Sequence, residues 1–139
     1  MTRDDFKRLH SELIMYCQCI EFDLKRIYSG MSTGDFDDNM DMLETSNFGR
    51  TLMALKKLDY SDGRPDLSES DYEILNQIRE IRNYWCHQCY IDYIYIANDY
   101  HREKEFQRLA NRLSDEHKCL HDIHRRLENL YISEYGRSI

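Results

Sequence analysis

The spacing of apolar residues constrains the fold of this chain more than any other feature. Between residues 6 and 28 apolar side chains recur at intervals of three and four, which places them in one stripe along an amphipathic helix. Later segments repeat this spacing, and strands are not needed anywhere. Only five glycines and one proline are present to interrupt helices. The pattern therefore predicts an all-α protein.

We expect four main helices. The first ends at Gly30, and a shorter one covers residues 48–58. The segment 31–45 has weak periodicity and is expected to be a loop with at most one short helical turn. Ser68 with Asp71 matches the capping arrangement that starts a third helix over residues 69–97.

The fourth helix is expected to start after Asn98 or Asp99. Four apolar residues in it recur every seven positions, a spacing that suits near-parallel bundle packing: Phe106, Leu113, Leu120 and Leu127. A chain of 139 residues has room for one domain with its own core. We therefore predict a single domain, residues 1–139, folded as an up-and-down bundle of four to five helices.

Charge is distributed unevenly along the chain. The net charge is −7, and residues 33–73 hold eleven acidic against four basic side chains. This balance argues against a broad surface that coats nucleic acid, but it leaves a local phosphate site open. No apolar run approaches the ~20 residues of a membrane span, and the charged first residues lack a signal-peptide pattern. We expect a cytoplasmic protein with reduced cysteines.

The third expected helix has two faces. On a helical wheel one side forms a core face, made of Ile74, Ile78, Ile81, Trp85, Cys89 and Ile96. The opposite side carries Asn83, His87, Tyr90 and Ile94, with Arg82 at the border. A monomer leaves this second face uncovered, and a two-fold homodimer is the commonest way to bury it.

Arg82, Asn83 and His87 spell Arg-Asn-x-x-x-His late in this helix. The motif, in an all-helical chain of this length with another long helix after it, resembles the HEPN superfamily. These are small all-α domains named for higher eukaryotes and prokaryotes nucleotide-binding. The resemblance implies a metal-independent endoribonuclease of toxin–antitoxin or phage-defence type, without a cofactor, with its site formed across a homodimer.

On this resemblance His87 acts as acid or base, Arg82 clamps the phosphate, and Asn83 orients the reacting groups. Tyr90 and Ile94 are expected at the substrate or dimer interface. Some HEPN toxins carry, two residues after the histidine, a tyrosine that a nucleotidyltransferase antitoxin modifies with AMP. Cys89 occupies that position here and the tyrosine comes one residue later, so this regulation is not carried over.

Two other functions stay open. The first is a non-catalytic HEPN-like module that partners a nucleotidyltransferase or a larger complex. The second is a metal-binding protein, suggested by two groups of side chains: Cys17, Cys19, Cys86 and Cys89, and His117, His121 and His124. Cys17 and Cys19 point roughly 200° apart on a helix, so we expect the thiols to fill the core. We expect the histidines on a solvated basic face.

Overall fold

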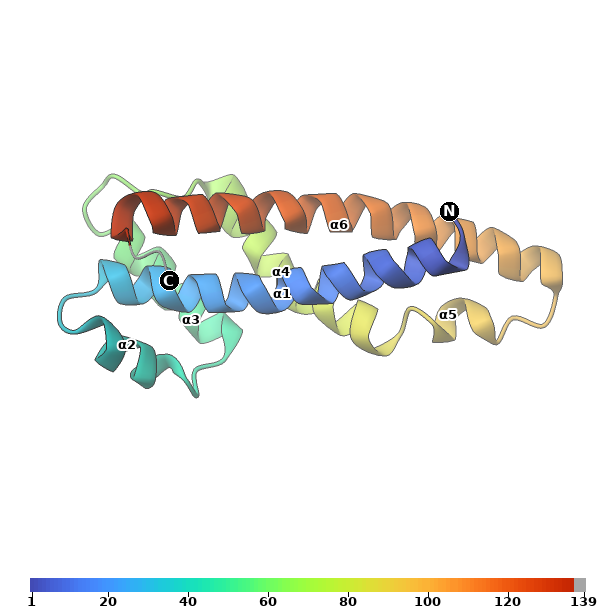
Figure 1. The fold of residues 1–139 in the computed structure, drawn as a ribbon, viewed down its shortest axis with the longest axis horizontal. Helices are drawn as coiled ribbons and strands as arrows, with labels where there is room; N and C mark the ends of the chain where they lie inside the picture. The colour runs from blue at the N-terminus through green and yellow to red at the C-terminus, as the bar shows by residue number, and fades with distance from the viewer. Residues whose placement is uncertain (137–139) are drawn as a thin grey trace.

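The computed structural model describes residues 1–136, which form six helices and no strand. In chain order these are α1 (Arg3–Met31), α2 (Phe36–Leu43), α3 (Phe48–Asp59), α4 (Glu69–His87), α5 (Ile91–Ile94) and α6 (Asp99–Tyr135) (Figure 1). The all-α bundle predicted from the apolar spacing is confirmed. Over these residues no helix combines the length and the apolarity needed to cross a membrane.

The two longest helices, α1 and α6, lie side by side and run in the same direction (Figure 1). Arg3 pairs with Glu103 near the start of both helices, and Gly30 lies against Tyr135 near their ends. A Cβ atom at Gly30 would sit 2.7 Å from the Tyr135 ring, so glycine allows this close approach. Gly30 therefore does not end α1, which continues to Met31.

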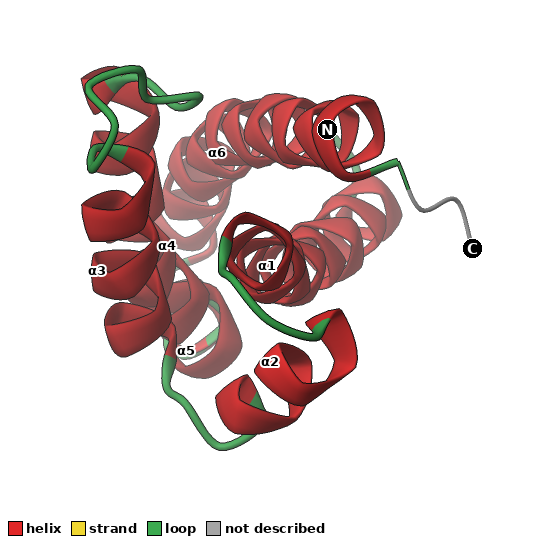
Figure 2. Ribbon diagram, turned by 90° about the vertical axis from the view of Figure 1, so that its left-hand side faces the viewer, coloured by secondary structure: helices red, strands yellow, loops and turns green. Residues whose placement is uncertain are grey.

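Helix α4 runs in the opposite direction to α6. Its Asp71 meets Arg126 near the end of α6, whereas its Trp85 meets Glu116 earlier in α6. Figure 2 shows α1 and α6 almost end-on, with α3 and α4 on one side of this pair and α2 beside α1. Helices α1 and α6 are thus parallel, and α4 runs antiparallel to both.

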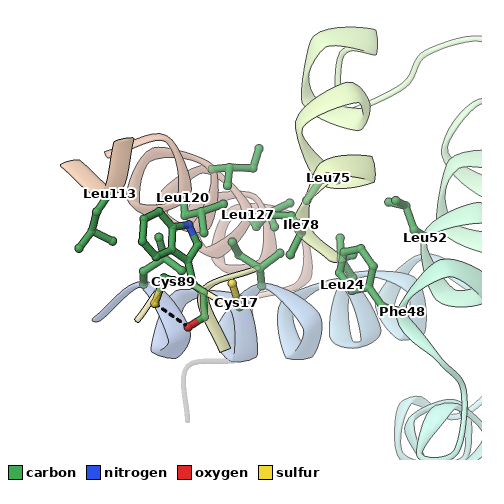
Figure 3. Packing of buried hydrophobic residues seen from close by; sticks show 14 of the residues in the cluster. Cys17, Leu24, Phe48, Leu52, Leu75, Ile78, Cys89, Leu113, Leu120 and Leu127 are labelled. Carbon is green, nitrogen blue, oxygen red and sulfur yellow. Dashed lines mark hydrogen bonds between the residues drawn. The ribbon is translucent and has the colours of Figure 1, made fainter. Parts of the chain in front are cut away.

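The core lies between these helices and contains the predicted seven-residue repeat. Phe106, Leu113, Leu120 and Leu127 are fully buried. Figure 3 shows part of this core, in which side chains from α1, α3, α4 and α6 pack together. Full burial of one such side chain contributes about 1.5–3 kcal/mol, so the repeat is a main source of stability.

Polar side chains start the five longer helices. Each residue before the first helical turn accepts a hydrogen bond from a backbone N–H three positions later: Thr2, Asp35, Asn47, Ser68 and Asn98. The predicted cap at Ser68 is confirmed, as is a start of α6 after Asn98. The cap at Asp35 begins α2, an eight-residue helix in the segment expected to be a loop. That helix buries only Leu43, which explains its weak periodicity.

One continuous helix over residues 69–97 is wrong. Helix α4 ends at His87, and after a turn the short helix α5 begins at Ile91. The backbone N–H groups of Gln88 and Cys89 both donate to the Tyr84 carbonyl, at 2.9 and 3.2 Å, which ends the regular pattern. Cys89 is buried after the turn, and in one continuous helix it would also fall on the core face. The apolar spacing therefore does not reveal that the helix ends at His87.

Candidate functional site

Arg82 lies where α4 borders α1. Its Nη1 donates to Oε2 of Glu21 at 3.2 Å, and both side chains are partly buried. The predicted border position is therefore confirmed. An arginine carries five N–H donors in a planar fork, so most of this fork remains open to another group. The bond to Glu21 orients the guanidinium and leaves its other N–H groups available to another molecule.

Asn83 and His87 are exposed in the last two turns of α4. They are four residues apart and therefore share one face of the helix, as predicted. Neither side chain has a hydrogen bond, ion pair or ring contact within residues 1–136. Polar groups of a folded chain usually find partners when they are buried, but these two are left to solvent or to another molecule.

Tyr90 does not share the face of His87, so that part of the prediction is wrong. The turn after α4 directs the Tyr90 ring towards α1, where ring centroids lie 5.7 Å from Phe6 and 5.1 Å from His10. Burial raises the pKa of Tyr90, so its hydroxyl keeps the proton at neutral pH. Ile94 is exposed on α5, as expected for an interface residue.

The turn after His87 is held by residues that sequence reasoning missed. The Trp85 carbonyl accepts a hydrogen bond from Nε2 of His10 at 2.6 Å and one from the Cys89 thiol at 3.4 Å. The indole N–H of Trp85 donates to Glu116 on α6. His10 and Glu116 are far from the motif along the chain, and no local pattern marks them. Together they fix the end of α4 that carries His87.

A second clamp joins this turn to α5. The Tyr84 hydroxyl donates to Asp92 at 2.7 Å, and Nε2 of Gln88 donates to the same carboxylate at 2.9 Å. Burial, followed by the bond to Asp92, raises the pKa of Tyr84. The Arg112 guanidinium lies 3.9 Å from the centre of the Tyr84 ring. The motif thus sits beside a rigid turn and not on a mobile loop.

The cysteines divide between core and surface. Cys17 and Cys89 are buried, and burial raises the pKa of their thiols to about 12 and about 11. Protonated thiols are poor nucleophiles and poor metal ligands. Cys86 is exposed and Cys19 half-buried, so the prediction that all four fill the core is wrong for these two. No group of three or more His, Cys, Asp or Glu in residues 1–136 is placed to hold a metal ion.

The α6 histidines do not form a solvated basic face, which corrects the prediction. His117 and His124 each contact a carboxylate of α1. Nε2 of His117 lies 2.7 Å from Oε2 of Glu12, and Nδ1 of His124 lies 2.9 Å from Oδ2 of Asp23. All three rings, including that of His121, surround Tyr16 of α1, with centroids 5.3–5.7 Å away. These histidines therefore belong to the contact between the two parallel helices.

Comparisons with protein-family models, with curated proteins and with solved structures find no match to this chain. The resemblance to the HEPN superfamily therefore stays a prediction, based on the motif and on its place in an all-α bundle. A functional assignment has to rest on the side chains themselves. Asn83 and His87 are exposed without a partner in the described residues, and the neighbouring Arg82 donates to Glu21 through Nη1.

Proposed function

We propose that this protein is a metal-independent endoribonuclease that acts as a homodimer, with Arg82 and His87 of each protomer at a composite site. The proposal rests on one observation. Asn83 and His87 face outward from a fixed helix end with no partner in the described chain, next to an arginine whose fork is mostly open.

The chemistry requires a base, an acid and a fixed cation. The 2′-hydroxyl of RNA attacks the neighbouring phosphorus and loses its proton to a base, while the departing 5′-oxygen takes a proton from an acid. The products carry a 2′,3′-cyclic phosphate and a 5′-hydroxyl. A histidine exchanges protons near neutral pH, and an arginine stabilises the charge that develops on the phosphorane. Asn83 can donate to a phosphate oxygen and orient it.

A dimer supplies what one protomer lacks. Each chain presents His87 once, whereas the reaction uses one protonated and one neutral group. A two-fold axis near the motif would bring two copies of His87 and Arg82 to the same phosphate. Exposed apolar residues on α5 support this arrangement, because Ile91 and Ile94 are 53% and 52% exposed.

An RNA cleavage assay in EDTA tests the proposed reaction. The wild type should cleave single-stranded RNA to ends with a 2′,3′-cyclic phosphate, and Arg82→Ala and His87→Ala should each lower the rate by about 100-fold or more. Exposed residues elsewhere on α6 provide matched controls, Arg125→Ala and His101→Ala, which should cleave at the wild-type rate. If the wild type leaves RNA intact, or if His87→Ala cleaves as well as the wild type, the proposal is wrong.

Expression in cells tests whether the protein acts in the cytoplasm as a ribonuclease of toxin or phage-defence type. Wild-type protein produced without a partner should arrest growth, and His87→Ala produced at the same level should not. Equal growth of the two strains would remove this part of the proposal. The RNA assay above is independent of it, because cleavage in vitro does not require a toxic cellular target.

Light scattering tests the proposed dimer, because it measures the mass of the protein in solution. Ile94→Asp places a charge on the apolar surface of α5 and should halve the mass measured by light scattering. Ile132→Asp is the matched control, because Ile132 is exposed to a similar degree on α6. A wild-type mass of one chain, or a dimer that persists in Ile94→Asp, would contradict the proposed interface.

The alternative is a binding module without catalysis. It is favoured by the apolar surface formed by Ile91 and Ile94 of α5 and by Tyr95 directly after it, which are exposed and could dock a nucleotidyltransferase or another protein. This reading predicts intact RNA in the assay above and a co-purifying partner protein that Ile94→Asp releases. His87→Ala should retain the partner, so the two functions separate on the same variants.

A further inference from the structure

A pocket lies where the beginning of α1, the short helix α5 and the beginning of α6 meet. Figure 1 shows these three segments together at the end of the molecule that carries the N-terminus. The pocket has a volume of about 370 Å³, within the ~300–1,000 Å³ of small-molecule sites. Six residues line it, and we call it the basic–aromatic pocket: Arg3, Lys7, Tyr90, Tyr93, Ile94 and Arg102.

The aromatic wall is fixed from behind. The rings of Tyr90 and Tyr93 pack edge-on against Phe6, with centroids 5.7 and 6.1 Å away. Their hydroxyl groups make no hydrogen bond to any residue of the described chain. Burial raises the pKa of both tyrosines, so each hydroxyl remains a neutral donor. Tyr93 is only 6% exposed and belongs to the core, so the half-buried Tyr90 is the ring that can meet a planar ligand.

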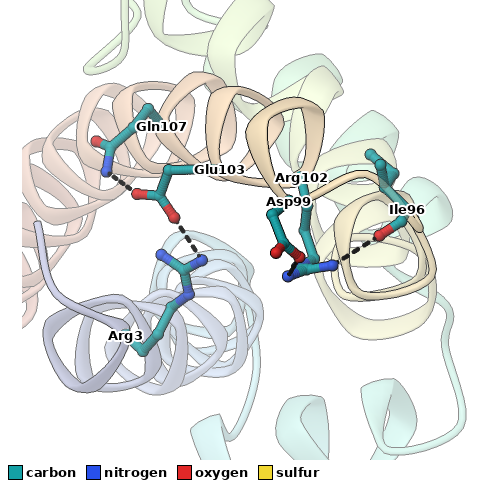
Figure 4. Close-up of polar contacts among 6 residues, drawn as sticks. All are labelled: Arg3, Ile96, Asp99, Arg102, Glu103 and Gln107. Atoms are coloured by element: carbon teal, nitrogen blue, oxygen red, sulfur yellow. Dashed lines mark hydrogen bonds and ion pairs between the residues drawn. The ribbon is translucent and has the colours of Figure 1, made fainter.

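The two arginines are held in place by neighbouring groups, and Figure 4 shows their polar contacts. Arg3 lies 3.5 Å from the centre of the Phe106 ring and donates to Glu103 at 2.8 Å. Arg102 pairs with Asp99 and donates to the Ile96 carbonyl at 2.9 Å. Each guanidinium therefore has a fixed orientation and further N–H groups to offer.

Lys7 adds a cation without a carboxylate partner in the described chain. The pocket lining carries three cations, and Glu103 and Asp99 balance two of them. A local excess of positive charge remains in a protein whose net charge is −7. A ligand that combines an aromatic plane with a negative charge complements this lining.

We propose that the basic–aromatic pocket binds one nucleotide of single-stranded RNA, with its base against Tyr90 and its phosphate at Lys7. Stacking on aromatic side chains and a cation on the backbone are the usual means of holding single strands. Tyr90 follows His87 by three residues in the sequence, although its ring faces α1. This inference rests on the proposed function and names the substrate as an unpaired strand.

Binding to an uncleavable strand tests the pocket. The probe is a fluorescein-labelled 12-nucleotide RNA with 2′-O-methyl groups, which lacks the attacking hydroxyl, and its affinity is measured by fluorescence anisotropy. Lys7→Ala should weaken binding about threefold to tenfold and reduce the slope of log affinity against log salt by about 1. Tyr90→Leu should weaken binding about tenfold through lost stacking.

Matched controls lie outside the pocket. Lys118→Ala removes an exposed cation of α6, and Tyr95→Leu removes an exposed tyrosine that does not line the pocket. Both should bind the probe with the wild-type affinity. If Lys7→Ala and Tyr90→Leu also bind as the wild type does, or change the mass of the protein instead of its affinity, the pocket does not hold RNA.

The two proposals fail in different ways. Cleavage of unmodified RNA by the wild type, with no effect of the pocket variants on probe binding, overturns the pocket and leaves the nuclease. Probe binding that depends on Lys7 and Tyr90, without cleavage of unmodified RNA, overturns the nuclease and leaves the pocket.

Discussion

The two ends of α4 differ in how their polar groups are used. At the first end Ser68 and Asp71 exchange hydrogen bonds at 2.9 and 3.1 Å, and Arg126 of α6 donates to both oxygens of Asp71, at 2.6 and 2.9 Å. Asp71 is only 1% exposed. At the other end Asn83 and His87 are exposed and have no partner within residues 1–136.

This difference separates stability from function within one helix. A buried polar group costs free energy unless it is paired, so the first end must be satisfied for the chain to fold. Exposed groups carry no such requirement and are free to serve another molecule. The backbone of the second end is nevertheless fixed, because the Trp85 carbonyl and indole are both hydrogen-bonded. A rigid support with free side chains is what a binding or catalytic site needs.

Among the changes that test this difference, Asp59→Ala should lower the free energy of unfolding most. Asp59 is the last residue of α3 and supports the first end of α4. The Asp59 carboxylate accepts hydrogen bonds from the backbone N–H groups of Asp66 and Leu67 at 2.8 and 3.1 Å, and from the Tyr72 hydroxyl at 2.7 Å. Its loss leaves three donors without an acceptor. The free energy of unfolding, measured in urea, should fall by about 3 kcal/mol.

Asp115→Ala is the control for this change, because Asp115 is exposed on α6 and has no partner in the described chain. It should alter stability by no more than about 0.5 kcal/mol. Equal stability of the Asp59 and Asp115 variants would mean that the first end of α4 does not depend on its polar support.

A smaller effect is expected for Arg126→Ala, which removes both hydrogen bonds to Asp71 from α6. The backbone N–H of Ser68 still reaches Asp71, and Arg126 is more than half exposed, so solvent screens the pair. We expect the free energy of unfolding to fall by about 1–2 kcal/mol. Arg125→Ala, one residue earlier and without a partner in the described residues, should leave it unchanged. Similar values for these two neighbours would contradict the role given to Arg126.

The smallest effect on folding is expected at the other end of α4. Asn83→Ala and His87→Ala remove no hydrogen bond, so each should change the free energy of unfolding by less than about 0.5 kcal/mol. Asn83→Ala should be slightly stabilising, because alanine favours the helix. A loss above about 1 kcal/mol in either variant would show that these side chains support the fold and would remove the contrast between the two ends.

Features set by residues close in sequence were predictable. The cap formed by Ser68 and Asp71 spans three residues, and the border position of Arg82 follows from the helical wheel. The exposure of Asn83 and His87 follows from the same wheel. The break after His87 was not predictable from the wheel, because Cys89 fits the apolar stripe of a longer helix equally well. The wheel therefore placed Tyr90 on the wrong face.

The apolar spacing established the all-α class, the buried stripes of the long helices and the face that carries Asn83 and His87, because a repeat of about 3.6 residues is a local property of the chain. Only the tertiary structure decided which groups meet. His10 reaches the Trp85 carbonyl across 75 positions, and Lys7 comes to lie beside Tyr90, although neither pair shares a sequence pattern. Such contacts depend on the parallel packing of α1 and α6, which brings the beginnings of these two helices together near the turn that follows the motif.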